Sequence, residues 1–203
     1  MKHDLIALFL LLASLTSLAQ DKPIAGPFGF ERGMTREEVT KLVGKGTPSA
    51  KNPNVVFTFT SAPKPNPAFE KYSLFFSPTQ GLLKVIAVGV TISTSDTGTE
   101  LQGGFTAVVS GVSQKYGQPE HTYDMCNGGT GCSGESVWRL GLLEKNRTLA
   151  AYWKATQRSN GVNLISLEAT PLSLNSGYVV LAYEFTGWEA FVDEVQAKQN
   201  TSF

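Results

Sequence analysis

The chain has 203 residues, and its 17 lysines and arginines balance 17 aspartates and glutamates, so the formal net charge at pH 7 is zero. A neutral chain without a basic cluster lacks the positive surface patch that binds nucleic acid or an anionic membrane, so neither is predicted as a partner. The length is enough for one domain, or for two small units that share a core.

The first 19 residues have the pattern of a secretory signal peptide. Lys2 gives a positive start, residues 5–12 form an unbroken apolar run, and Ser17 and Ala19 are small residues where a signal peptidase reads. The run is too short for a transmembrane helix, and no cysteine stands near the cleavage point to take a lipid anchor. We expect cleavage after Ala19 and a periplasmic or secreted protein without a stable membrane anchor.

The range 20–98 is predicted to open with a short helix. Thr35 and Glu38 have the spacing of a capping box, which marks a helix start. Either Gly44 or Gly46 ends the helix, and Pro48 prevents it from continuing. The apolar residues at helical spacing, which we expect on one buried face, are Val39, Leu42 and Val43.

Strands are predicted after this helix. VVFTFT (55–60) alternates in polarity, whereas SAPKPNP (61–67) reads as a proline-rich loop. FEKYSLFF (69–76) and LLKVIAVGVTI (82–92) read as a hairpin around the turn SPTQG (77–81).

The range 99–203 repeats this order. Thr99 and Gln102 predict a second capping box and a helix that ends at Gly117. Strands are predicted at 135–142 (ESVWRLGL), 148–155 (TLAAYWKA), 162–169 (VNLISLEA) and 177–185 (GYVVLAYEF), with a loop over 170–176 (TPLSLNS). Thr186 and Glu189 predict a third capping box and a C-terminal helix. The fold class is therefore α+β: short helices on a mostly antiparallel sheet, in a unit that occurs about twice and shares one core.

The segment GMTREEVTKLVGKGTP, from Gly33 to Pro48, resembles the helix-opening signature of two families of small secreted proteins. One is the SmpA/OmlA family, the small lipoproteins of the outer-membrane barrel-assembly machinery, and the other is the β-lactamase inhibitory proteins. Both families pack short helices on an antiparallel sheet, and the inhibitors contain that unit twice. The resemblance extends in outline to 99–119. It implies a fold more than a function, and the motif carries no contact residue of the inhibitors. The lipidated cysteine of the lipoproteins has no counterpart near the leader.

Cys126 and Cys132 are the two cysteines of the chain, in the segment CNGGTGC. In an exported protein a disulfide is the default, and the glycines between the cysteines let the loop close. The alternative is a metal site that adds His121 and Asp124, although this spacing matches no common zinc pattern. We expect the disulfide, and no bound metal.

The sequence contains no GxSxG elbow, phosphate loop, HExxH pattern or calcium loop, so we expect neither an enzyme nor a cofactor. His121 reads as a surface or turn residue. Tyrosine and tryptophan are favoured anchors of protein interfaces. Each of the three tryptophans, Trp138, Trp153 and Trp188, is expected in the core, and the predicted partner-binding residues are Tyr152, Lys154, Tyr123 and Arg139.

These observations predict a non-enzymatic secreted or periplasmic protein that binds a partner protein, with an inhibitor-like role as one form of it. An envelope-assembly accessory and a binder of a lipid or other small ligand are the alternatives. A continuous apolar cavity would favour the ligand binder, whereas an exposed aromatic patch on the sheet would favour the protein binder.

Overall fold

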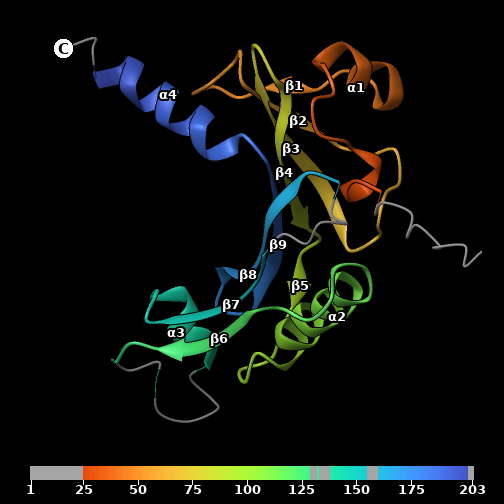
Figure 1. Cartoon of the computed structure of the whole chain (residues 1–203). Coiled ribbons are helices and arrows are strands. Elements are labelled where there is room, and N and C mark those ends of the chain that lie inside the picture. The colour runs from red at the N-terminus through yellow and green to blue at the C-terminus, as the bar shows by residue number, and fades with distance from the viewer. Residues whose placement is uncertain (1–24, 129–131, 133–137, 155–159, 201–203) are drawn as a thin grey trace, which may run out of the picture.

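The fold is known from a computed structural model, which describes residues 25–128, 132, 138–154 and 160–200 (Figure 1). The predicted signal peptide lies outside these residues. The helical elements in the described part are η1 (Pro27–Gly29), α1 (Arg36–Val43), α2 (Thr99–Tyr116), α3 (Trp138–Leu143) and α4 (Trp188–Asn200). The strands are β1 (Thr47–Pro48), β2 (Val56–Phe59), β3 (Phe69–Ser77), β4 (Gly81–Gly89), β5 (Ile92–Ser93), β6 (His121–Cys126), β7 (Arg147–Lys154), β8 (Val162–Ser173) and β9 (Ser176–Phe185).

All nine strands belong to one antiparallel sheet in the order β1-β2-β3-β4-β9-β8-β7-β6, and β5 pairs with β9 off this path. Strands β1 to β4 come from the range 20–98, and β6 to β9 come from the range 99–203. The two sets meet where β4 pairs with β9, from Lys84 opposite Glu184 to Val88 opposite Val180. The predicted α+β class, with helices on an antiparallel sheet and a helix at the C-terminus, is confirmed.

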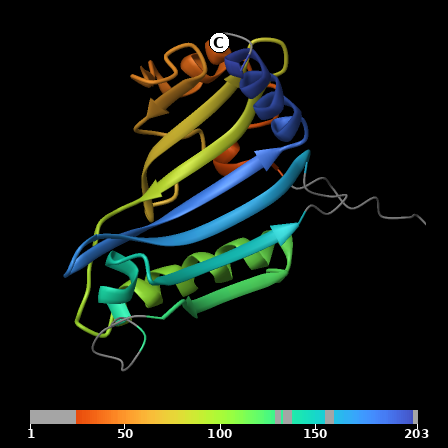
Figure 2. The same cartoon turned by 90° about the vertical axis from the view of Figure 1, so that its left-hand side faces the viewer.

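The helices lie on two sides of this sheet. Helices α1 and α2 lie on one side, and α4 leaves the sheet on the other side (Figures 1 and 2). The main core lies under α2, whose Leu101 and Phe105 are buried with sheet residues such as Leu167, Leu181 and Trp153. Helix α3 packs against β7 and β8 near the start of α2, because Trp138 lies directly against Gly98. The prediction that Trp138 and Trp153 belong to the core is confirmed, with 6% and 2% exposure, whereas Trp188 is only half-buried and lies outside the core.

The first capping box forms as predicted. The Thr35 hydroxyl accepts a hydrogen bond from the Glu38 backbone N–H at 3.2 Å, and the Glu38 carboxylate accepts one from the Thr35 N–H at 2.8 Å. Val39 is fully buried, but Leu42 is 56% exposed, so its predicted burial is wrong. A helix this short contacts the core through a narrow strip of its surface. Val39 and Val43, four residues apart, lie on that strip.

The other two predicted capping boxes are wrong. The N-cap of α2 is Gly98, which has a φ of 73° and no capping side chain. The Glu100 carboxylate instead accepts hydrogen bonds from the Ser95 N–H at 2.7 Å and the Ser95 hydroxyl at 2.8 Å. Helix α4 begins at Trp188, and the Thr186 hydroxyl donates to the Gly161 carbonyl, so this threonine lies one residue before the N-cap position.

Two segments adopt a different secondary structure from the one predicted. ESVWRLGL was expected to be a strand, but from Trp138 it forms α3, whose buried residues Trp138, Gly141 and Leu142 have helical spacing. A short apolar run fits both periods, and here packing against the core favours the helix. The second segment is 121–126, for which no strand was predicted and which forms β6; His121, expected at the surface or in a turn, is exposed there.

Strand boundaries differ from the predictions in two places. The predicted loop over 170–176 is mostly strand, since β8 continues to Ser173 and pairs with β9 across a short turn. The predicted strand 82–92 is divided into β4 and β5. Elsewhere the hairpin signals hold, and Asn160 and Gly161 both have positive φ, as the predicted two-residue turn requires.

Candidate functional site

The sheet has one face that α1 and α2 leave uncovered, and we call it the open face. The strand registers place three rows of side chains on it, each running across the sheet. The first row is Tyr123, Ala150, Glu168, Val180, Val88 and Lys71. The second is His121, Tyr152, Ser166, Ala182, Ile86 and Ser73. The third is Lys154, Leu164, Glu184, Lys84, Phe75 and Val56.

The middle of the open face is apolar and shallow. Val88, Ile86 and Val180 are half-buried, and Ala182, with only 8% exposure, forms part of the floor between them. Small side chains in the centre of a sheet leave room for a partner to approach the backbone closely. Figure 2 views the sheet from this side, and the ribbon of β4 and β9 is uncovered there within the described part of the chain.

One end of the open face is closed by α4. The Trp188 ring meets Phe75 edge-on at 5.3 Å between centroids, and the Lys84 ammonium lies 4.7 Å from the Trp188 centroid. Lys84 also forms a salt bridge with Glu184 at 2.7 Å, with both side chains largely buried. These contacts cover the β3 and β4 part of the third row, so the first two rows form the accessible surface.

The opposite end of the open face carries a cluster of rings, which we call the aromatic edge: His121, Tyr123 and Tyr152. Tyr123 and Tyr152 meet edge-to-face at 5.9 Å between centroids, and His121 and Tyr123 are 5.8 Å apart. Two rings come from β6 and one from β7, and both tyrosines are half-exposed. The geometry gives a rigid aromatic surface, since each ring is held by its neighbour and by the sheet.

Charged side chains border the aromatic edge. The Lys154 ammonium forms a salt bridge with the Glu120 carboxylate at 2.8 Å, and the same carboxylate lies 3.9 Å from His121 Nε2. The hydrogen bond from Lys154 holds the pKa of Glu120 below its usual value. With 75% of the Lys154 side chain exposed, this pair forms a solvated rim beside the rings.

The structure therefore brings three of the four predicted partner-binding residues together: Tyr123, Tyr152 and Lys154. Arg139 does not join them. It lies on α3 and pairs with Asp96, which precedes α2, whereas Tyr152 and Lys154 lie at the far end of β7 from α3. The placement of Arg139 failed because it assumed a strand. Glu120 is the neighbour that the sequence analysis missed, and His121, named there only as a surface or turn residue, joins the cluster because β6 pairs with β7.

Cys126 and Cys132 are bonded to each other, so the predicted disulfide is confirmed. The Cα atoms are 5.4 Å apart, and the bond ties the end of β6 to the following segment. Asp124, one of the four residues of the alternative metal site, accepts hydrogen bonds from the Arg147 guanidinium at 2.6 Å and from the Trp138 indole N–H at 3.2 Å. Within the described residues no three histidine, cysteine or acidic side chains gather as metal ligands.

Compared with protein families, with curated proteins and with solved structures, the chain matches no family model, no curated protein and no solved structure. The resemblance of Gly33–Pro48 to the lipoprotein and inhibitor families therefore stays a prediction. None of the described helices combines the length and the apolar character that crossing a membrane requires.

Proposed function

We propose that this chain is a non-enzymatic periplasmic or secreted protein that binds a partner protein through the open face of its sheet. The observation that carries the proposal is the aromatic edge on the same open face as an uncovered apolar floor, with Glu168 and Ser166 of β8 between the two. Partly exposed tyrosines that contact each other, on a sheet face that also carries apolar surface, have the character of interface hot spots. The solvated Lys154–Glu120 pair at their border has the character of an interface rim.

The proposed surface would accept a protein segment better than a small molecule. It is a flat sheet face without side walls, whereas small-molecule sites are concave. A protruding loop could rest on the floor formed by Ala182 and its neighbours and contact Tyr123 and Tyr152 from one side. The cystine at the end of β6 would hold the aromatic edge in place beforehand, which lowers the entropy cost of binding.

An inhibitor-like role is one form of this function, and it rests on the same surface. An envelope-assembly role rests on the Gly33–Pro48 motif alone, and no feature of the open face favours it. Oxidation of Cys126 and Cys132 to a disulfide fits an oxidising compartment, which supports the periplasmic or secreted location.

Affinity capture from envelope and secreted fractions tests the proposal when three baits are compared by quantitative mass spectrometry. The baits are the wild-type chain, the double variant Tyr123→Ser/Tyr152→Ser, and the control Leu42→Ser, which removes an exposed apolar side chain from α1. We expect a protein that the wild type and the control retain and that the double variant loses. Equal capture by all three, with unchanged urea unfolding of each bait, would contradict the open face as the binding surface.

A further inference from the structure

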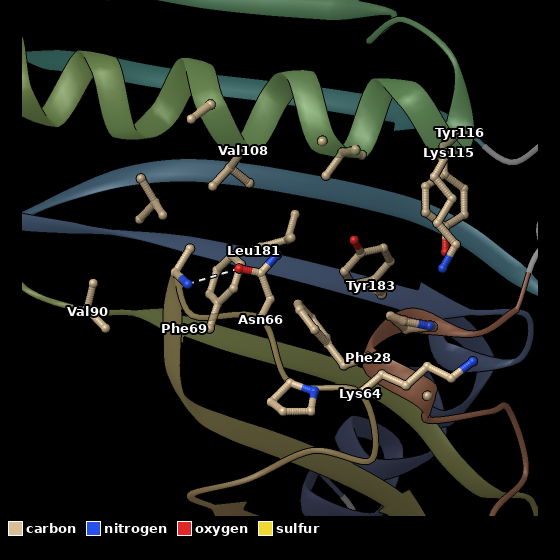
Figure 3. A pocket seen from close by; sticks show the side chains of 18 of the residues that line it. Phe28, Lys64, Asn66, Phe69, Val90, Val108, Lys115, Tyr116, Leu181 and Tyr183 are labelled. Carbon is tan, nitrogen blue, oxygen red and sulfur yellow. Dashed lines mark hydrogen bonds between the residues drawn. The ribbon is translucent and has the colours of Figure 1, made fainter.

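A cavity of about 560 Å³ lies on the other side of the sheet from the open face. It lies between α2, the segment 25–29 that contains η1, and the segment 64–69 before β3, and its floor is β9 (Figure 3). Its volume is within the range of about 300–1,000 Å³ that is usual for small-molecule sites. The proposed protein-binding function does not use it.

One end of the cavity is apolar. Val108 of α2, Leu181 of β9, Phe69 of β3 and Val90 after β4 line it, and Figure 3 shows them on the side away from the charged groups. Helix α2 leaves room here because the small residues Ala107 and Gly111 line the cavity, whereas the Ile92 side chain packs directly against Gly104. An unbranched hydrocarbon chain fits such a surface by burying its methylene groups.

The other end of the cavity carries two buried phenols, Tyr116 and Tyr183. Their rings are 5.8 Å apart between centroids, and the residues are only 8% and 5% exposed. The Tyr116 hydroxyl has no hydrogen-bond partner among the described residues, although it is buried. A buried donor without a partner is costly, so this hydroxyl is available to donate to an acceptor atom of a ligand in the cavity. The Tyr116 phenol is protonated at neutral pH and can donate, and burial raises its pKa further, to about 12.

Two lysines stand at the same end as the phenols. Lys64 and Lys115 line the cavity, and its described lining includes no carboxylate. Neither lysine forms a salt bridge with a described residue; the one hydrogen bond of the Lys115 ammonium goes to the Gly26 carbonyl at 3.4 Å. Partial burial and the charge of Lys64 lower the pKa of Lys115. Both lysine residues are solvent-exposed, so their ammonium groups are free to pair with an anion that enters the cavity beside the Tyr116 hydroxyl.

We infer that this cavity binds a single-chain anionic amphiphile, a fatty acid or a carboxylate of similar shape. Its carboxylate would lie among the Lys64 and Lys115 ammonium groups and accept the hydrogen bond of the Tyr116 hydroxyl. Its hydrocarbon chain would run under α2 towards Val108 and Leu181. The inference is independent of the open face, because the two surfaces lie on opposite sides of the sheet.

Isothermal titration calorimetry of the exported protein with sodium dodecanoate, below its micelle concentration, tests this inference. We expect one equivalent of dodecanoate to bind. The double variant Lys64→Gln/Lys115→Gln should bind about tenfold more weakly or worse, since each lysine offers a charge-assisted hydrogen bond. Dodecyltrimethylammonium, with the same chain and a positive head, should bind more weakly than dodecanoate.

A matched pair of variants on α2 separates filling of the cavity from damage to the helix. A side chain added at Gly111 or Gly103 would meet no atom within 4 Å at its Cβ, but only Gly111 lines the cavity. Gly111→Leu should abolish dodecanoate binding, whereas Gly103→Leu should leave it unchanged, and both variants should keep the wild-type urea midpoint or exceed it.

Three outcomes would overturn the inference. The first is that the wild type does not bind dodecanoate. The second is that Gly111→Leu and Gly103→Leu change dodecanoate binding equally, and the third is that the wild type binds dodecyltrimethylammonium as tightly as dodecanoate. Co-sedimentation with phosphatidylglycerol vesicles is a further arm. Binding to these vesicles without binding to dodecanoate would identify a two-chain membrane lipid and contradict the single-chain assignment.

Discussion

The substitution Thr35→Ala tests how much a local capping box contributes to the stability of the whole chain. It removes the acceptor of the 3.2 Å hydrogen bond from the Glu38 N–H, and it leaves that donor without its partner at the start of α1. Losses of this kind cost roughly 0.5–2 kcal/mol in proteins. We expect a value inside this range, because α1 has only eight residues and Val39 is its one fully buried side chain.

Urea unfolding followed by circular dichroism measures the effect. A loss of about 1 kcal/mol, divided by a slope of about 2 kcal/mol/M, lowers the midpoint by about 0.5 M with the slope unchanged. Thr99→Ala is the matched control, since Thr99 is exposed and its hydroxyl bonds to the Thr97 hydroxyl, while the N-cap of α2 is Gly98. An equal loss of unfolding free energy in the two variants would refute the reasoning. The expected loss comes from the capping hydrogen bond of Thr35 and not from replacing any exposed threonine by alanine.

Three further perturbations have defined outcomes. Gly98→Ala should destabilise the chain by at least about 1–2 kcal/mol, since Gly98 has a φ of 73° and an added Cβ would collide with the Trp138 ring, and a lower melting temperature would register it. Hydrogen bonds from the Ser95 backbone lower the pKa of Glu100 from 4.5 to about 2, so the carboxylate stabilises the fold above pH 4.5 and loses that effect as the pH falls towards 2. The difference in unfolding free energy between wild type and Glu100→Gln should therefore shrink as the pH falls from 4.5 towards 2. Urea titrations at several pH values measure it, and a difference that does not change with pH would contradict the prediction. Reducing the Cys126–Cys132 bond should cost about 2–2.5 kcal/mol, and mass spectrometry after alkylation without reduction should find no free thiol in the exported chain.

The parts of the fold that could be predicted are those whose signals are local. Thr35, Glu38 and Val39 lie within one turn of each other, so their cap and buried face follow from spacing alone. The hairpin of β3 and β4 and the turn at Asn160 are equally local. At Thr99 the same pattern failed, because the Thr99 hydroxyl bonds to the Thr97 hydroxyl, the Gln102 amide donates to the Thr97 carbonyl, and Gly98 is the N-cap.

The open face could be predicted in part. Alternation along β7 separates Tyr152 and Lys154 from Trp153, and this assignment holds. Tyr123 lies beside Tyr152 because β6 pairs with β7. This pairing joins segments that are far apart in the sequence, so no short sequence pattern predicts it. The cavity under α2 could not be predicted from the sequence for the same reason, because three separate segments form its walls.

Site-specific photocrosslinking tests the central claim, binding of a partner protein to the open face, most directly. A photoreactive benzoylphenylalanine replaces Tyr152 at the aromatic edge in one chain, and replaces the exposed Leu42 of α1 in the control chain. After irradiation in the envelope or secreted fraction, we predict a covalent adduct with one protein from position 152 and none from position 42. An adduct from position 42 alone, or from neither position, would contradict the account.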